Sequence, residues 1–285
     1  APWVDMEKHM REKKEAILSL ESKCPLHEFD IIGFSLQYEM NYTDILNMLD
    51  LGGVPLYSKE RADTDPIVIA GGPCAFNPEP LADFIDVFVI GEAEEVILEI
   101  ARLVQGSRFK VQGGRGVILK ELAKIEGVYV PASRQPPQLL ELPDTATPGV
   151  AEVEGIRKRI IKDLDSSYFP TDIVVPYIQI VHDRIGIEIM RGCPHECKFC
   201  QARKIFHPLR IRSVKRIMEI AEESVKNTGY EEISLLSLSS GDYPHIEELA
   251  AKLEEKFKPL GIKISLPSLR VGTFEEHKGM DTLKR

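Results

Sequence analysis

Short apolar runs alternate with segments of helical periodicity along the first half of the chain. Three apolar runs predict buried strands, over Asp30–Gln37, Pro66–Ala70 and Asp86–Ile90. Apolar positions three and four residues apart predict helices over Tyr42–Leu51, Glu92–Val104 and Val117–Ile125. Wholly apolar strands separated by helices are typical of a parallel sheet that is covered on both faces. We therefore expect a doubly wound α/β domain with a parallel sheet.

The second half continues the alternation in the order β-α-β-α-β. Strands are predicted over Arg184–Met190, Glu232–Leu238 and Lys263–Leu269, and helices over Ser213–Asn227 and His245–Pro259. Ser213 is a candidate N-cap, and Gly229 lies just past the end of its helix. Pro131–Val150 contains five prolines and little periodicity, which predicts a linker. We expect one α/β domain over residues 1–130, a linker and connecting extension over 131–176, and a second domain over 177–285.

Charge is distributed unevenly within a net charge of −9. Residues 1–150 carry 14 Lys and Arg against 24 Asp and Glu (−10), and residues 151–285 carry 22 against 21 (+1). The acidic first half argues against non-specific nucleic-acid binding there. Seven basic residues and no acidic one lie between Glu196 and Glu219, namely Lys198, Arg203, Lys204, Arg210, Arg212, Lys215 and Arg216. This run is compatible with a solvated helix face, and it leaves a nucleic-acid partner open.

The composition argues against a membrane protein. Hydrophobic residues make up 43% and charged residues 28%, as in ordinary globular proteins. No apolar run approaches the ~20 residues that a membrane-spanning helix needs. Ala1–Asp5 has neither the basic start nor the apolar stretch of a signal peptide. The expected location is the cytoplasm, with no membrane partner.

Three of the five cysteines lie within one short segment directly after a predicted strand. Cys193, Cys197 and Cys200 have the spacing C-x3-C-x2-C. Three thiolates on one loop can bind three irons of a [4Fe–4S] cluster and leave the fourth iron open to a small molecule. A zinc site that adds His195 or His207 is the alternative, although no second cysteine pair is present. An odd cysteine count without a secretion signal argues against a disulfide framework.

The cysteine segment, with Phe199 before the last cysteine, resembles the radical S-adenosylmethionine (SAM) superfamily. The resemblance implies a [4Fe–4S] cluster on Cys193, Cys197 and Cys200, and reductive cleavage of SAM to a 5′-deoxyadenosyl radical. It also implies that Phe199 contacts the adenine of SAM. Ser240, Gly241 and Asp242 stand where that family has Gly-Gly-Glu, which holds the SAM amino group. Ser268 and Arg270, at the end of the third strand, are expected near the SAM ribose or carboxylate.

The first half resembles the cobalamin-binding domain that precedes many radical SAM domains. The resemblance rests on Gly71-Gly72-Pro73 and on Gly91-Glu92, which would lie at strand ends facing the nucleotide tail of cobalamin. Together with the cysteine segment, these motifs resemble one uncharacterised family of such proteins over nearly the full chain. The usual Asp-x-His-x-x-Gly motif for the lower cobalt ligand is absent. Cobalamin therefore stays an open alternative that is not expected in this chain.

The resemblance implies a doubly wound, cobalamin-binding-like domain followed by the first part of a radical SAM (β/α) barrel. Only 85 residues follow Cys200, whereas a full barrel takes ~250 residues, so a truncated chain is expected. The implied cofactors are the [4Fe–4S] cluster and SAM, with flavodoxin or ferredoxin as electron donor. The substrate is not readable. Two other functions stay open, a cobalamin-dependent radical SAM methyltransferase and a zinc-stabilised interaction module.

Overall fold

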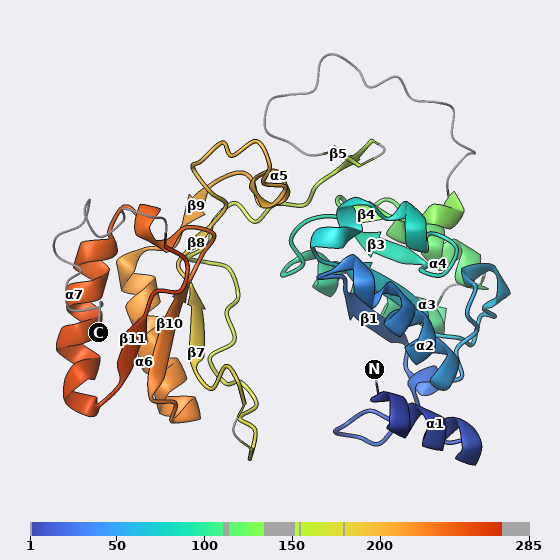
Figure 1. Cartoon of the computed structure of the whole chain (residues 1–285). Coiled ribbons are helices and arrows are strands. Elements are labelled where there is room, and N and C mark those ends of the chain that lie inside the picture. The colour runs from blue at the N-terminus through green and yellow to red at the C-terminus, as the bar shows by residue number, and fades with distance from the viewer. Residues whose placement is uncertain (1, 111–113, 134–151, 154, 179, 270–285) are drawn as a thin grey trace. The chain divides into compact units, whose positions relative to one another are not determined.

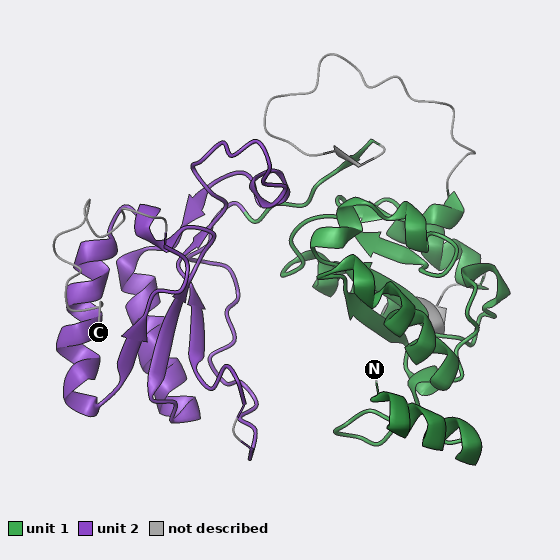
Figure 2. Cartoon of the chain, in the orientation of Figure 1, with its two compact units in different colours: residues 1–161 green, residues 162–285 purple. Residues whose placement is uncertain are grey.

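The chain folds into two compact units, residues 1–161 and residues 162–285 (Figure 2). The structure, a computed structural model, describes residues 2–110, 114–133, 152–153, 155–178 and 180–269. Most of the predicted linker Pro131–Val150 lies outside these residues. The predicted connecting extension is divided, because residues 156–161 belong to the first unit and residues 162–176 to the second.

The first unit is built on a four-stranded sheet in the order β1-β2-β3-β4 (Figure 1). The strands are β1 (Ile31–Ser35), β2 (Ile67–Gly71), β3 (Val87–Val89) and β4 (Val128–Tyr129). β1, β2 and β3 are parallel, as predicted, and β4 joins β3 antiparallel. Its longer helices are α1 (Val4–Lys13), α2 (Tyr42–Leu51), α3 (Val96–Lys110) and α4 (Gly114–Leu122). A small hairpin of β5 (Glu152–Val153) and β6 (Ile156–Arg157) follows.

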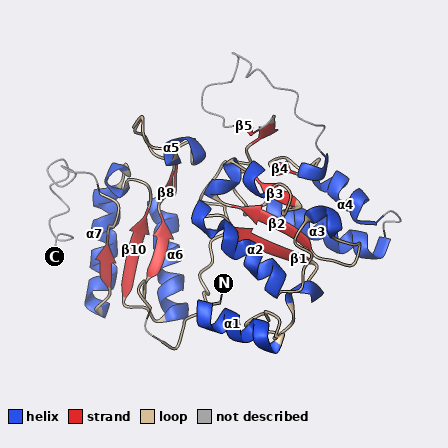
Figure 3. Cartoon of the chain, turned by 45° about the vertical axis from the view of Figure 1, so that its right-hand side comes forward, coloured by secondary structure: helices blue, strands red, loops and turns tan. Residues whose placement is uncertain are grey.

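Both faces of this sheet are buried, which confirms the α/β prediction. Val68 and Phe88 pack on one face with Ile45 and Leu49 of α2. The opposite face carries Ile67, Ile69 and Val87, which pack with residues of α3 and α4. Figure 3 shows helices on both sides of the strands. The described strands lie side by side in the order of the sequence, so the strand order does not reverse at any point among them.

The second unit has a three-stranded parallel sheet in the order β11-β10-β7. Its strands are β7 (Ile185–Glu188), β10 (Glu232–Leu236) and β11 (Lys263–Ser265), and its long helices are α6 (Val214–Thr228) and α7 (Ile246–Phe257). The Ser213 hydroxyl caps α6 by accepting the Arg216 N–H at 3.1 Å, and Gly229 ends the helix at φ +71°. Strands that add in sequence, each after a helix, form the first part of a (β/α) barrel.

A short antiparallel hairpin continues from β7 and encloses the cysteine segment. Its strands are β8 (Met190–Arg191) and β9 (Arg210–Ile211), and the four-residue helix α5 (Ala202–Ile205) lies between them. The hairpin divides the strand that the sequence predicts over Arg184–Met190. It places the cysteine loop at the carboxyl end of β7, the edge where such sheets carry their chemistry.

Arg212 is buried, although the basic run suggested a solvated helix face. Its Nε donates to the Glu188 carbonyl at 3.1 Å, and its guanidinium also bonds the Leu164 carbonyl. The neighbouring Ser213 N–H donates to Asp165 at 2.7 Å. These contacts fasten the segment after residue 161 to the sheet of the second unit. No helix of the described residues is long and apolar enough to cross a membrane.

Candidate cluster and nucleotide site

The cysteine loop depends on a glycine at its first position. Gly192 has φ +92°, in the left-handed region that favours glycine. A Cβ at this position would lie 2.9 Å from both the Pro208 oxygen and the Leu209 Cα. The two ends of the loop can therefore approach each other only because Gly192 has no side chain.

The three thiols on this loop are suited to an iron–sulfur cluster. None of them is in a disulfide, Cys197 is exposed, and Cys193 and Cys200 are half-buried. The Cys200 N–H donates to the Cys197 carbonyl at 3.1 Å, which forms a turn between these two residues. Each cysteine ligand of a [4Fe–4S] cluster binds a different iron, so the thiols need not converge on one point. The donor set therefore fits the cluster in number and in chemistry.

A single zinc ion would require convergence that the described residues do not provide. Among them, no group of three His, Cys, Asp or Glu side chains is arranged to hold one metal ion. His195, which the zinc alternative would use, donates from Nε2 to Oδ2 of Asp242 at 2.7 Å. It is thus held by a carboxylate of the turn that follows β10.

Asp242 lies in a 3₁₀ turn, Ser240–Asp242, that follows β10. Its Oδ2 also accepts a hydrogen bond from the Ser239 hydroxyl at 2.5 Å. The Ser240 N–H donates to the Ser268 carbonyl at 2.7 Å, so the segment after β11 reaches the same turn. The structure therefore brings Ser240, Asp242 and Ser268 together beside the cysteine loop.

The remaining residues expected at the SAM site differ in how far they are exposed to solvent. The Phe199 side chain is 92% exposed on the cysteine loop, where it can meet a ligand. The Ser240 hydroxyl is fully buried and donates to the Leu235 carbonyl at 3.0 Å, so it stabilises the turn. Gly241 is buried in the same turn. Arg270 lies outside the described residues.

An ion pair at the base of the loop was missed by the sequence interpretation. Arg191 donates from two nitrogens to the two carboxylate oxygens of Glu188, at 2.8 and 2.7 Å. A bidentate pair of this kind fixes the orientation of both side chains. Opposite charges three residues apart, immediately before the Gly192-Cys193 pair, were the available signal.

The glycines of the first unit make room for the chain itself. Gly72 has φ +99°, and a Cβ there would lie 3.0 Å from the Leu36 oxygen. Gly91 has φ +113°, and a Cβ there would collide with the backbone of Arg159. Gly71 has only ordinary contacts at 3.7 Å with Val89. The close approach expected for a cobalamin tail is therefore made at Gly72 and Gly91 by the protein's own backbone.

Residues 158–161 lie along the end of β3. The Arg159 N–H donates to the Ile90 carbonyl at 2.9 Å, and the Glu92 N–H donates to the Arg159 carbonyl at 3.1 Å. The buried carboxylate of Glu92 accepts the Ile161 N–H at 2.6 Å. Glu92 therefore has a structural role in binding this segment, whereas the sequence placed it in the cobalamin crevice.

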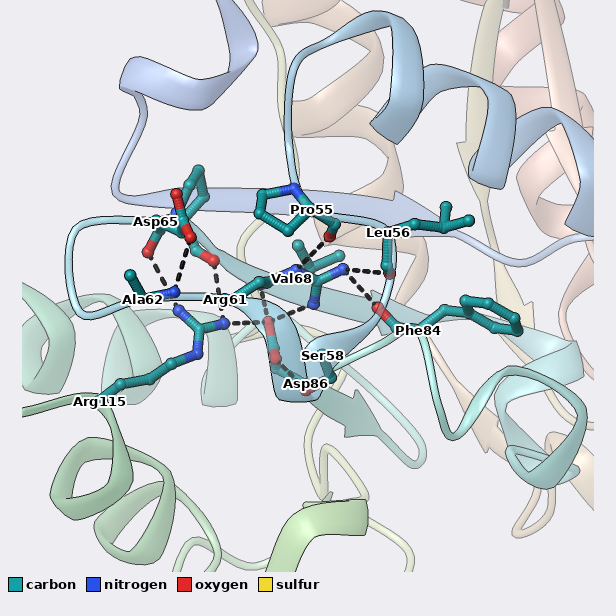
Figure 4. A network of polar contacts seen from close by, with 11 residues as sticks. Pro55, Leu56, Ser58, Arg61, Ala62, Asp65, Val68, Phe84, Asp86 and Arg115 are labelled. Atoms are coloured by element: carbon teal, nitrogen blue, oxygen red, sulfur yellow. Dashed lines mark hydrogen bonds and ion pairs between the residues drawn. The ribbon is translucent and has the colours of Figure 1, made fainter.

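A buried charge network in the first unit was also missed by the sequence interpretation (Figure 4). Asp86 accepts hydrogen bonds from Arg61 at 2.8 Å, Arg115 at 2.5 Å, the Ser58 hydroxyl at 2.5 Å and the Val68 N–H at 2.7 Å. Burial lowers the pKa of Arg61, and the Asp86 carboxylate opposes that shift. The network joins the segments that precede β2 and β3 to the start of α4.

A cavity of about 580 Å³ lies beside this network. Its walls carry both signs of charge, including Lys59, Arg115, Asp63 and Asp83. Since Arg61 and Asp86 precede β2 and β3, this is the amino end of the parallel strands. Ligands of α/β sheets bind at the carboxyl ends, so the cavity is the weaker candidate site.

Comparison with known protein families agrees with the fold of both units. Residues 1–131 match the family described as radical SAM proteins, N-terminal, and residues 187–283 match the radical SAM superfamily. The chain therefore belongs to the radical SAM superfamily, a superfamily of enzymes, and carries both of these domains in that order.

Related sequences extend over different parts of the chain. An uncharacterized protein of Methanocaldococcus jannaschii is 30% identical over 270 residues, which are 93% of this chain and 50% of that protein. The anaerobic magnesium-protoporphyrin IX monomethyl ester cyclase of Rubrivivax gelatinosus is 30% identical over 149 residues, 51% of this chain and 22% of the cyclase. The chain thus spans half or less of the length of these relatives.

A solved structure has the same overall fold. The radical SAM methyltransferase TsrM from Kitasatospora setae, with cobalamin and a [4Fe–4S] cluster bound, matches at a TM-score of 0.51 with 12% identity. The match covers 96% of this chain and 50% of that one. At this identity the likeness concerns the fold alone, and it extends over both units.

Proposed function

We propose that Cys193, Cys197 and Cys200 bind a [4Fe–4S] cluster and that the neighbouring turn after β10 binds SAM. The observation that carries this proposal is the juxtaposition of three free thiols with the Asp242 turn, at the carboxyl ends of β7 and β10. A reduced cluster supplies the electron that cleaves SAM to methionine and a 5′-deoxyadenosyl radical, which abstracts hydrogen from a substrate that remains unidentified.

The protein residues bind and orient SAM in this proposal. Asp242 presents a carboxylate that accepts charge-assisted hydrogen bonds from the SAM ammonium. Phe199, exposed on the loop, offers an apolar face to the adenine. Ser268, whose carbonyl meets the turn, and Arg270 are assigned to the ribose or carboxylate of SAM.

The electron donor is proposed to be a flavodoxin or ferredoxin, and the location to be the cytoplasm. Both follow from the chemistry, since free thiolate ligands and a cluster that must be reduced suit a reducing compartment. Cobalamin-dependent methyl transfer is the second candidate, favoured by the fold shared with the methyltransferase TsrM.

Cluster binding is tested by anaerobic reconstitution. The wild-type protein should bind about four irons per chain and absorb broadly near ~400 nm, because each thiolate binds one iron of the cubane. Changing Cys193, Cys197 and Cys200 together to Ala should abolish both signals. Replacing Cys24 and Cys74, which lie in the other unit, is the matched control and should leave the iron content unchanged. Unaltered iron in the triple variant would refute the proposal.

SAM binding is tested by calorimetry on reconstituted protein. Asp242→Ala removes a charged acceptor, and the loss of such a hydrogen bond costs roughly 1.5–3 kcal/mol. The affinity for SAM should therefore fall about ten- to a hundredfold. A variant that binds SAM as tightly as the wild type would mean that Asp242 serves only the turn.

A further inference from the structure

The hydrogen bond from His195 to Asp242 joins the cysteine loop to the turn that follows β10. His195 lies two residues after Cys193 and two residues before Cys197, near the middle of the proposed ligand set. Its Nε2 lies 2.7 Å from Oδ2 of Asp242, and the two side chains are 33% and 17% exposed. The bond is thus partly shielded from solvent, and it joins residues that are 47 positions apart in the sequence.

Asp242 is oriented by two donors on the same oxygen. The Ser239 hydroxyl comes from the turn itself, at 2.5 Å, and His195 comes from the cysteine loop. A carboxylate has about four acceptor positions on its two oxygens. Both bonds use positions on Oδ2, and together they orient the carboxylate.

We propose that His195 is a positioning residue, which holds the cysteine loop against the Asp242 turn and thereby sets the cluster ligands relative to the SAM ammonium site. The inference rests on the proposed function. In it, His195 contacts neither the cluster nor SAM and acts through the position of the loop. Two contacts within the hairpin are local, the turn between Cys197 and Cys200 and the exposed pair of Arg203 with Glu196 at 2.8 Å. The bond of His195 connects the middle of the loop to the turn that follows β10.

Variants of His195 that keep or remove the donor toward Asp242 test this role. Gln places an amide N–H₂ at about the reach of the histidine Nε2, so His195→Gln retains a donor toward Asp242. His195→Ala removes the donor. Glu196→Ala is the matched control, because Glu196 is the next residue of the loop and its side chain is 82% exposed, so its pair with Arg203 should contribute little.

The first measurement uses the iron-free protein and needs no activity. Amide hydrogen exchange should quicken severalfold over residues 192–200 in His195→Ala, because the loop loses its bond to the turn. His195→Gln should exchange within about twofold of the wild type. In an Asp242→Ala background, His195→Ala should cause no further change, as a double-mutant cycle requires for a direct interaction.

The second measurement uses reconstituted protein and SAM calorimetry. His195→Ala should bind SAM about five- to tenfold more weakly, whereas His195→Gln and Glu196→Ala should match the wild type. Unchanged loop exchange and unchanged SAM affinity in His195→Ala would overturn the inference, as would a Gln variant that behaves like Ala. If the wild-type protein binds no iron, the proposed function fails, and the exchange measurement still decides whether His195 holds the loop.

Discussion

Asp86 shows what a single buried side chain does in this fold. Its carboxylate is fully buried between the guanidinium groups of Arg61 and Arg115. Backbone carbonyls add to the network, since Arg61 donates to Pro55, Leu56 and Phe84, and Arg115 donates to Asp65 and Pro66. A buried ion pair stabilises a fold only when its hydrogen bonds are satisfied, and removing one partner leaves an uncompensated charge.

Asp86→Asn is therefore expected to destabilise the first unit by about 3–5 kcal/mol, because two buried cations lose the carboxylate with which both form ion pairs. Urea unfolding measures the effect. Asp83→Asn is the control, since Asp83 is exposed three residues earlier and should change the free energy of unfolding by no more than about 0.5 kcal/mol. Equal losses in the two variants would show that the network does not stabilise the fold.

Local residue roles could be predicted from the sequence, and long-range ones could not. Ser213 and Gly229 were correctly placed at the ends of α6, because capping depends on neighbours within one turn. The pairing of His195 with Asp242 depends on two strand ends meeting in space. Nothing within either local segment encodes that contact, so the two residues were interpreted separately.

At the scale of elements, the prediction was successful where a strand lies within a run of several apolar residues. The cores of β1, β2, β3 and β10 fall within the predicted runs. β4 and β9 have two residues each, which is too short for a periodic signal, and both were missed. The hairpin around the cysteine loop was missed for this reason, because β9 provides its returning strand.

Gly192→Ala tests whether that hairpin needs its glycine. The variant must place a Cβ against the backbone of Pro208 and Leu209, and it also adopts a positive φ. Gly229→Ala is the matched control, because Gly229 has φ +71° with open space around its Cβ position. The control should lose about 1–2 kcal/mol from the left-handed conformation alone. Gly192→Ala should lose more in urea unfolding, and it alone should reduce iron uptake. Equal losses and full iron uptake would mean that the loop tolerates a side chain there.

At the scale of the whole molecule, composition predicted a linker over residues 131–150 but did not predict where the two units divide. The prolines mark residues 131–150, whereas the chain divides after residue 161. The composition of residues 156–161 does not assign them to either unit. They belong to the first unit because the backbone of Arg159 bonds to Ile90 and Glu92. Such pairing depends on where the end of β3 lies in space, which the local sequence does not show.

This placement leads to the final prediction, which concerns cobalamin. His9 and His27 are the only histidines in the sequence of the first unit. His9 lies in α1, and His27 lies ahead of β1 with its Nδ1 3.2 Å from the Gly52 oxygen, so neither follows a strand of the sheet. Gly72 and Gly91, where the nucleotide tail was expected, are approached by the chain's own backbone.

The protein incubated with hydroxocobalamin should therefore retain no stoichiometric cobalamin absorbance after desalting, because the contacts left for the cofactor are too few to offset the cost of association. A one-to-one complex that survives the column would contradict this expectation and would make cobalamin-dependent methyl transfer the leading function. In that event His9→Ala and His27→Ala would separate the two forms of binding. Loss of retention in either variant would identify a histidine ligand, and unchanged retention in both would indicate binding through the nucleotide tail, for which residues 158–161 would have to leave the end of β3.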